Sequence, residues 1–197
     1  MTQVDRLYVP ADFDPSEFAN IEPIGRELIE REIGSPSELE QWLLDASELS
    51  CAISEHFARI RIHYSCHTDD ADAEAAFMHY VEHVQPKLQP MYFELQGKYV
   101  RCEWRSAIEI TPRLEQLGRT WQADVEIFRE ANVPLQTQVS KLTSEYDKLC
   151  GAMTVEYDGK TQTLQQMGRY LDETDRSVRE EAWRLTTGRR LADREKM

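Results

Sequence analysis

The chain has 197 residues, of which 41% are hydrophobic and 30% are charged, with only eight Gly and eight Pro. This composition is that of an ordinary folded protein, long enough for one helical domain or one lobe of a larger protein. The formal net charge is −13, which argues against nucleic acid and anionic membrane as partners because both bind to basic faces. The sequence has no long apolar run and no signal-peptide core, so we expect a cytoplasmic protein.

The first part of the chain predicts an extended arm and two helices. Residues 1–19 favour an extended arm because prolines and alternating polar residues interrupt any helical period. A first helix is expected over about 23–33, with Gly34 as its stop signal. A second helix begins at the capping sequence 35–38, in which a Ser, a Pro at the first helical position and a Glu form a capping box. Apolar residues at steps of three and four then continue to Tyr64, which predicts one long amphipathic helix.

Further helices follow, each opened by an acidic or proline start signal. The acidic residues 69–72 cap the third helix, in which we expect Pro86 to cause a kink or a restart and Pro90 to open a new stretch. Thr111 and the proline after it start another helix, and the next one is stopped by Gly151. The third helix is expected to bury Ala73, Ala76, Phe77, Tyr80, Val84 and Leu88. The helix before Gly151 has its apolar register at Leu135, Val139, Leu142, Tyr146 and Leu149.

Residues 153–163 predict a β-hairpin in this otherwise helical chain. The dipeptide Asp158-Gly159 suits a two-residue type I′ turn, because both turn positions need φ > 0. β-branched and aromatic residues flank the turn on both sides, as in strands. Thr163 then caps a short helix, with Gln166 three positions later as its capping-box partner.

The last helix completes the prediction of a mostly α fold. It opens at Asp175 and has an apolar stripe at Val178, Ala182 and Leu185. Because the sequence has no internal repeat and no linker, we expect an antiparallel helical lobe over residues 1–197, with one small hairpin. The chain stops without a capping Gly or Pro, which favours a fragment of a longer polypeptide.

Two stretches of the sequence resemble the oligoendopeptidase F branch of the thimet-type zinc metallopeptidases. The first is the Asp-Gly-Lys hairpin with the helix after it, where Asp175, Arg176, Arg179, Glu180 and Ala182 match a D-R-x-x-R-E-x-A pattern. The second is the stretch 57–72, in which a long helix ends and the next begins after a short acidic turn. The order of elements is similar to that of the family from about residue 10 to residue 197.

The resemblance implies a role for the chain within a larger protein. Members of this family are considerably longer, and an N-terminal helical lobe faces a catalytic lobe across a channel that admits short unfolded peptides. The catalytic lobe binds one zinc ion through H-E-x-x-H and a later Glu. This chain would be the N-terminal lobe, with zinc in the full-length parent and none bound here. Because the sequence has no H-E-x-x-H, no catalytic, cofactor-binding or metal residue is carried over, and we expect the segment to be inactive alone.

One local motif offers an alternative. His79, Glu82 and His83 form H-x-x-E-H, the inverted zinc-peptidase signature. On a helix the two imidazoles share one face and could bind one Zn²⁺, with Glu82 as the general base. A third ligand is needed, and Glu145 and Glu156 have suitable separations but no motif around them. We therefore expect surface histidines rather than a zinc site.

The other His and Cys residues suggest no active site. His63, Cys66 and His67 could form a metal site, but a fraying helix end explains them more simply. The four cysteines form no C-x-x-C pair, and we expect mostly buried, reduced thiols: Cys51, Cys66, Cys102 and Cys150. Six aromatic residues are expected in the core: Trp42, Tyr64, Tyr80, Trp104, Trp121 and Trp183.

Three functions follow from the sequence. The first is the substrate-channel lobe of a zinc metallo-oligopeptidase, with short peptides and the catalytic lobe of the same polypeptide as partners. The second is a self-contained zinc hydrolase that uses the residues at 79–83. The third is a non-enzymatic helical interaction domain that binds protein partners.

Overall fold

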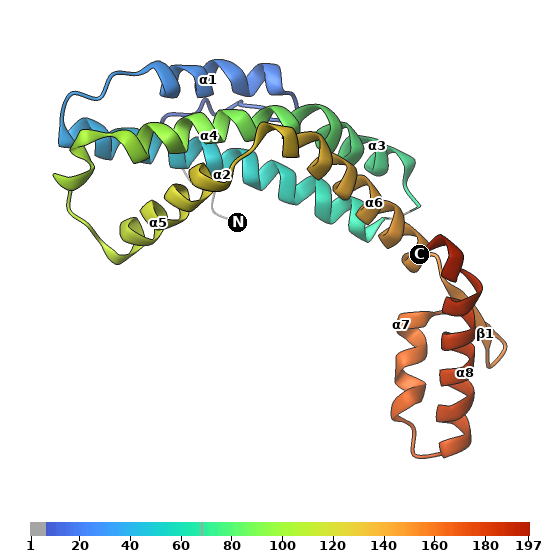
Figure 1. The fold of residues 1–197 in the computed structure, drawn as a ribbon. Helices are drawn as coiled ribbons and strands as arrows, with labels where there is room; N and C mark the ends of the chain where they lie inside the picture. Colours follow the sequence, from blue (N-terminus) through green and yellow to red (C-terminus); the bar gives the residue numbers. More distant parts are fainter. Residues whose placement is uncertain (1–6, 68) are drawn as a thin grey trace. The chain divides into compact units, whose positions relative to one another are not determined.

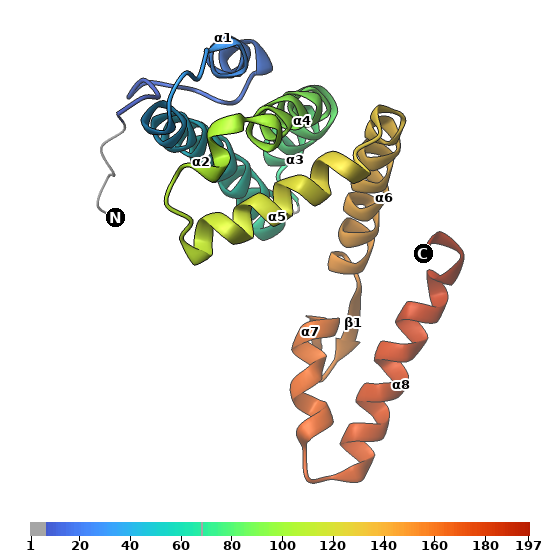
Figure 2. The same cartoon turned by 60° about the vertical axis from the view of Figure 1, so that its left-hand side comes forward.

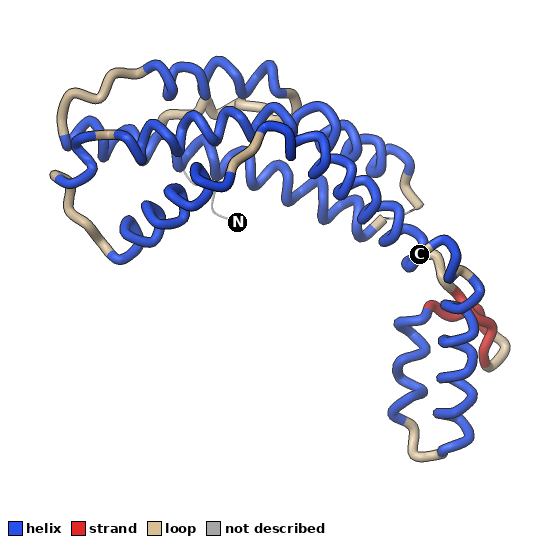
Figure 3. The backbone as a smooth tube through the Cα atoms, in the orientation of Figure 1, coloured by secondary structure: helices blue, strands red, loops and turns tan. Residues whose placement is uncertain are grey.

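The computed structural model of the chain describes residues 7–67 and 69–197. Most of these residues are helical, and the sheet that they contain is a single two-stranded antiparallel hairpin (Figure 3). The mostly α fold expected from the sequence is therefore confirmed. The described residues group into two compact units, one that extends to Gln138 and one from Val139 to Met197. The single lobe expected over residues 1–197 stays a prediction.

The first unit is built from long helices. α1 packs against both α2 and α4, α3 packs against α2, and α5 packs against α4 (Figures 1 and 2). A π-helical turn, η1, joins α3 to α4. The elements are α1 (Phe18–Glu30), α2 (Pro36–Cys66), α3 (Ala71–His79), η1 (Tyr80–Val84), α4 (Gln85–Arg101), η2 (Glu103–Ser106), α5 (Pro112–Ile127) and η3 (Glu130–Asn132). α6 (Val133–Gly151) begins in this unit and continues into the second.

The core of the first unit lies between α1, α2 and α4. Its side chains recur at helical spacing on the facing sides of these helices, and each fully buried large apolar side chain contributes about 1.5–3 kcal/mol. Among its most deeply buried members are Ile21, Leu28, Leu39, Trp42, Leu49, Val84 and Tyr99. A smaller cluster of Tyr64, Phe77 and Val81 lies where α2 meets α3 and η1.

The helix caps expected from the sequence form, with one change of partner. The Ser35 hydroxyl accepts the Glu38 N–H at 3.3 Å, and the Asp70 carboxylate accepts the Asp72 N–H at 2.9 Å. The Glu38 carboxylate does not close a capping box on Ser35. It accepts the N–H of Gly34 at 2.8 Å instead, one residue earlier.

The bounds of α1 differ from the helix expected over 23–33. The helix starts earlier because Ile21 and Leu28 both lie fully buried on the face that packs against the core. It ends earlier because donors from distant residues bind its last carbonyl groups. The Lys98 ammonium lies 2.9 Å from the Leu28 carbonyl oxygen and also reaches that of Arg31. These donors act as a C-terminal cap that local sequence cannot reveal.

The junction between α3 and α4 is a π-helical turn. The N–H of Gln85 donates to the carbonyl of Tyr80, five residues earlier, and Pro86 follows in the first turn of α4. Proline has no N–H, so the helix restarts there, as expected from the sequence. The new stretch expected at Pro90 is wrong, because α4 runs through Pro90 to Arg101. The burial expected for this helix needs two corrections, since Val81 is buried and Ala76 is exposed.

The second unit contains the hairpin and two helices that lie beside each other (Figure 2). Thr154 pairs with Thr163 and Tyr157 with Lys160, which confirms the hairpin predicted over 153–163. The turn residue Gly159 has φ 70°, and the residue before it has φ 53°, as a type I′ turn requires. The elements are β1 (Thr154–Tyr157), β2 (Lys160–Thr163), α7 (Leu164–Met167), η4 (Gly168–Asp172), α8 (Arg176–Ala192) and η5 (Arg194–Lys196).

The connection from the hairpin into α7 is fixed by the predicted capping box. The Thr163 hydroxyl accepts the Gln166 N–H at 3.2 Å, and the Gln166 side chain accepts the Thr163 N–H at 2.8 Å. The next helix, α8, is capped by Asp175, whose carboxylate accepts the Ser177 N–H at 2.8 Å. Within the described residues, no helix is both long enough and apolar enough to cross a lipid bilayer.

Candidate functional site

The residues of the H-x-x-E-H motif lie at the end of α3 and in η1. The ring centroids of His79 and His83 are 5.1 Å apart, so the two imidazoles do share a face. The Nε2 atom of His79 lies 2.9 Å from the carboxylate of Glu17, next to the start of α1. The Nε2 atom of His83 lies 3.8 Å from the carboxylate of Glu82, its neighbour in sequence.

This arrangement does not fit a zinc ion. A zinc site needs at least three protein ligands that converge on one point. Across residues 7–67 and 69–197, no three His, Cys, Asp or Glu side chains are placed to hold a metal. The two acidic residues considered as third ligands lie in the second unit, Glu145 on α6 and Glu156 on β1, where Glu156 accepts the Thr161 hydroxyl at 2.5 Å. We therefore assign no chemical step to zinc on this chain.

The second His and Cys group, at the end of α2, is a helix terminus. The ring centroids of His63 and His67 are 4.6 Å apart, and Nδ1 of His67 lies 3.0 Å from the His63 carbonyl oxygen. All four cysteines are free, but they are less buried than expected. Cys51 and Cys66 are exposed, and the other two are half-buried.

A hollow of about 230 Å³ lies between α1 and α4 in the first unit. Its floor is apolar, with Phe18 and Met91 among the lining residues, and the Lys87 ammonium lies 5.6 Å from the centroid of the Phe18 ring. The helices approach closely beside it, because a Cβ at Gly25 would lie only 2.2 Å from the Met91 sulfur. Two acidic and two basic side chains also line it: Glu22, Arg26, Lys87 and Glu94.

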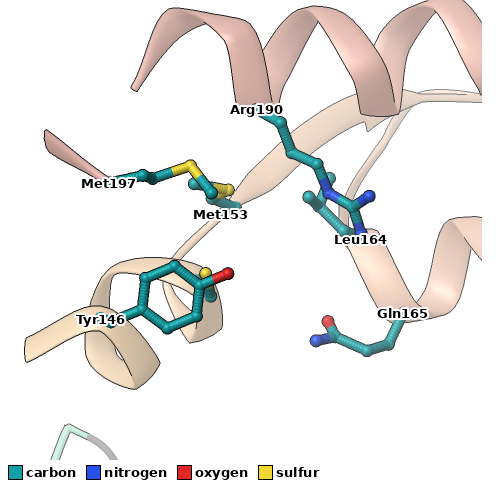
Figure 4. Close-up of a pocket in the computed structure, with 7 residues that line it drawn as sticks. Tyr146, Met153, Leu164, Gln165, Arg190 and Met197 are labelled. Atoms are coloured by element: carbon teal, nitrogen blue, oxygen red, sulfur yellow. The ribbon is translucent and has the colours of Figure 1, made fainter. Parts of the chain in front are cut away.

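The pocket drawn in Figure 4 lies in the second unit and has a volume of about 270 Å³. Tyr146 of α6 and Arg190 of α8 approach it from different sides, and α7 supplies Leu164 (Figure 4). A hydrogen bond with the Cys150 thiol raises the pKa of Tyr146 above its usual range. The complete lining is Tyr146, Cys150, Met153, Leu164, Gln165, Arg190 and Met197.

A second hollow in this unit is acidic and aromatic, with a volume of about 520 Å³. The rings of Tyr157 and Tyr170 meet edge to face there, with their centroids 4.6 Å apart. Neither this hollow nor the pocket of Figure 4 is lined by a His, so neither pairs a nucleophile with an imidazole base. The four carboxylates at the acidic hollow belong to Glu156, Asp158, Glu173 and Glu181.

Several apolar residues that the sequence marks for burial are exposed. Trp183 of α8, expected in the core, has 59% of its surface exposed. Of the other aromatic residues expected there, Trp42, Tyr64 and Tyr80 are buried. Four of the five residues in the apolar register of α6 are exposed as well, including Leu142 at 64%, whereas Leu149 is half-buried. The helical period in the sequence places these side chains on one face of α6 but does not show whether that face is buried.

Comparison with known proteins shows which solved structures have a similar fold. No protein-family model matches the sequence, and no curated protein sequence matches it either. Solved structures do match this chain. One is an oligoendopeptidase F assigned in Bacillus anthracis strain Ames, with a TM-score of 0.83, and another is PZ peptidase A in complex with an inhibitor, with a TM-score of 0.84. A third, also assigned as an oligoendopeptidase F, has a TM-score of 0.82.

These similarities concern the fold, since each structure is 18% identical to this chain in sequence. The matches cover 93–94% of this chain but only 33–34% of the other chains. The chain therefore spans about a third of the length of the structures that it matches. The resemblance expected from the sequence is confirmed in three dimensions: this chain has the fold of one third of an oligoendopeptidase F chain.

Proposed function

We propose that this chain is the N-terminal, non-catalytic lobe of a zinc-dependent metallo-oligopeptidase of the oligoendopeptidase F type. The observation that carries the proposal is the fold match over nearly the whole chain with only a third of each peptidase. The hairpin at 154–163 and the helix after it, which suggested the family in the sequence, both form in the structure. The catalytic H-E-x-x-H region would then belong to polypeptide outside residues 1–197.

In this role the helices would form one wall of a channel for short unfolded peptides. The wall would restrict entry by shape and would leave the chemistry to the catalytic lobe. The contacts of the described residues support a non-catalytic role for this lobe, because the motif histidines do not converge with a third ligand. Zinc would supply the Lewis acid of the complete enzyme. The cytoplasmic localisation expected from the sequence stays a prediction.

The test compares residues 1–197 with the product of the reading frame extended in the 3′ direction. We expect the extended protein to contain H-E-x-x-H, to bind about one zinc per chain and to cleave a quenched fluorescent peptide until a chelator removes the metal. A folded protein substrate should stay intact. Residues 1–197 alone should neither retain zinc nor cleave the peptide.

Two results would contradict the proposal. One is a reading frame that ends at Met197. The other is zinc-dependent cleavage by residues 1–197 that is lost on His83→Ala and kept on His67→Ala, a matched change at another exposed histidine. That second result would establish the self-contained zinc hydrolase instead.

A further inference from the structure

Three side chains form an exposed apolar stripe on α6, the α6 stripe: Val139, Leu142 and Tyr146. Their exposed fractions are 61%, 64% and 46%. They are spaced by three and four residues and so lie on one face of the helix. Such a period is typical of a helix face that is buried against other polypeptide. The opposite face carries Ser144, which is buried.

The second unit as a whole lacks the core that its length requires. Among residues 139–197, all of which the structure describes, only three apolar side chains are buried: Met153, Met167 and Ala182. Folded units of this size are marginal even with a good core. Seven large apolar side chains are exposed in the same unit: Val139, Leu142, Tyr146, Leu171, Trp183, Leu191 and Met197. Exposed apolar surface on this scale marks an interface.

The charge of the chain is divided between the units in a way that favours docking at the second. Residues 139–197 contain eleven Lys and Arg and eleven Asp and Glu, so the whole net charge of −13 belongs to residues 1–138. The second unit has no net charge, so a partner that approaches the α6 stripe is not repelled by an excess of one sign over the unit as a whole. Apolar contact can then decide the affinity without repulsion between like charges.

We propose that the α6 stripe is the docking face for the catalytic polypeptide of the same protein. This inference rests on the proposed function and names the surface through which the lobe holds its partner. The structures with the same fold are about three times as long as this chain, so polypeptide of the required size accompanies the fold in each of them. Tyr146 also borders the pocket of Figure 4, which would receive an apolar side chain of the partner beside Arg190.

The experiment places the same substitution in two forms of the protein. Leu142→Lys is introduced into residues 1–197 and into the product of the extended reading frame. Thr143→Lys is the matched control, because Thr143 is also exposed and lies about 100° around α6 from Leu142. Thermal unfolding is measured for all forms, peptide cleavage for the extended forms, and sedimentation equilibrium for residues 1–197.

The expected result differs between residues 1–197 and the extended protein. Leu142→Lys should change the melting temperature of residues 1–197 by less than about 1 °C and lower that of the extended protein by about 5 °C or more, because a lysine would be buried at the interface. Thr143→Lys should change neither. Equal effects of Leu142→Lys in both forms would overturn the docking inference.

Failure of this inference and failure of the proposed function give different results. If the extended protein is an active zinc peptidase and Leu142→Lys is silent in it, the stripe is not the docking face, although the function stands. If the extended protein is inactive but selectively destabilised, the docking face stands and the function is wrong. A dimer of residues 1–197 that Leu142→Lys dissociates would assign the stripe to a second copy and overturn the inference. A reading frame that ends at Met197 overturns both.

Discussion

The ammonium of Lys98 lies 2.9 Å from the carbonyl oxygen of Leu28, seventy residues earlier in the chain. The same ammonium lies 2.9 Å from the Ile29 carbonyl oxygen and reaches that of Arg31. It also lies 5.8 Å from the centroid of the Trp42 ring. One cation of α4 thus caps the end of α1 and ties three helices of the first unit together. Burial lowers the pKa of Lys98 from its usual range, and the nearby Arg31 lowers it further.

Replacing Lys98 by Met should destabilise the first unit. The methionine fills a similar volume but leaves the end carbonyls of α1 without their donor, which costs about 1–3 kcal/mol of unfolding free energy. Lys87→Met on the same helix is the control, because Lys87 is exposed and its ammonium lies over the ring of Phe18. It should cost less than about 0.5 kcal/mol. Urea unfolding followed by circular dichroism measures both, and equal midpoints would refute the capping role.

Glu48 holds the segment before α1 through three consecutive backbone N–H groups. Its carboxylate accepts those of Leu7, Tyr8 and Val9 at 3.1, 3.0 and 2.7 Å. Glu48→Ala should therefore speed hydrogen exchange at these amides by about tenfold or more, since charge-assisted hydrogen bonds are lost. Glu55→Ala is the control, because Glu55 pairs with an exposed arginine one helical turn away. Unchanged exchange at residues 7–9 in Glu48→Ala would contradict this prediction.

The hairpin turn gives a prediction with a matched pair of glycines. Gly159 has φ 70°, whereas Gly168 has φ −53°, and neither has an atom within 4 Å of the place where a Cβ would lie. Gly159→Ala should cost about 1–2 kcal/mol through backbone strain alone. Gly168→Ala should be neutral or stabilise by up to about 1 kcal/mol. Hydrogen exchange across 154–163 reports the difference, and similar effects of the two changes would rule out a strained turn.

His56 should make the first unit less stable in acid. Its ring packs 5.6 Å from the ring of Tyr80, and burial lowers the pKa of His56 from its usual 6.5, opposed only in part by the Asp14 carboxylate. The unfolded chain therefore binds the proton more readily, and stability falls as the pH drops through about 6.5. Between about pH 7.5 and about pH 5.5, the melting temperature of His56→Gln should fall by less than that of the parent protein. Equal losses would show that His56 does not contribute.

Elements with local signals could be predicted from the sequence. The long helix after Ser35, the turn at Gly159 and the capping box at Thr163 each depend on residues within four positions of one another. Their geometry needs no knowledge of the rest of the chain. The end of α1 could not be predicted, because the donor that sets it, Lys98, lies on another helix. The new stretch expected at Pro90 was wrong because a proline can remain inside a helix that neighbouring elements hold in place.

In the candidate sites, too, the sequence predicted features that depend on neighbouring residues and missed those that depend on distant ones. The sequence places His79 and His83 on one helix face, and their rings do lie side by side. It could not show that His79 meets Glu17, which comes from the start of another helix. The apolar period of α6 is equally visible in the sequence. Period alone does not distinguish a face that packs within the chain from one that stays exposed, as Leu142 does.

The π-helical turn at Tyr80–Val84 gives this protein a place where its length can change. A π-helical turn holds one residue more than the α-helical turn that it replaces. Deleting the exposed His83 would convert the turn to regular helix and keep Phe77 and Leu88 directed at the core. A deletion in the middle of α4 would instead rotate every later residue by about 100° and remove Leu95 from the core. Insertions and deletions among related chains should therefore collect in this turn. Thermal unfolding of variants with single-residue deletions in the turn and in α4 would test this expectation.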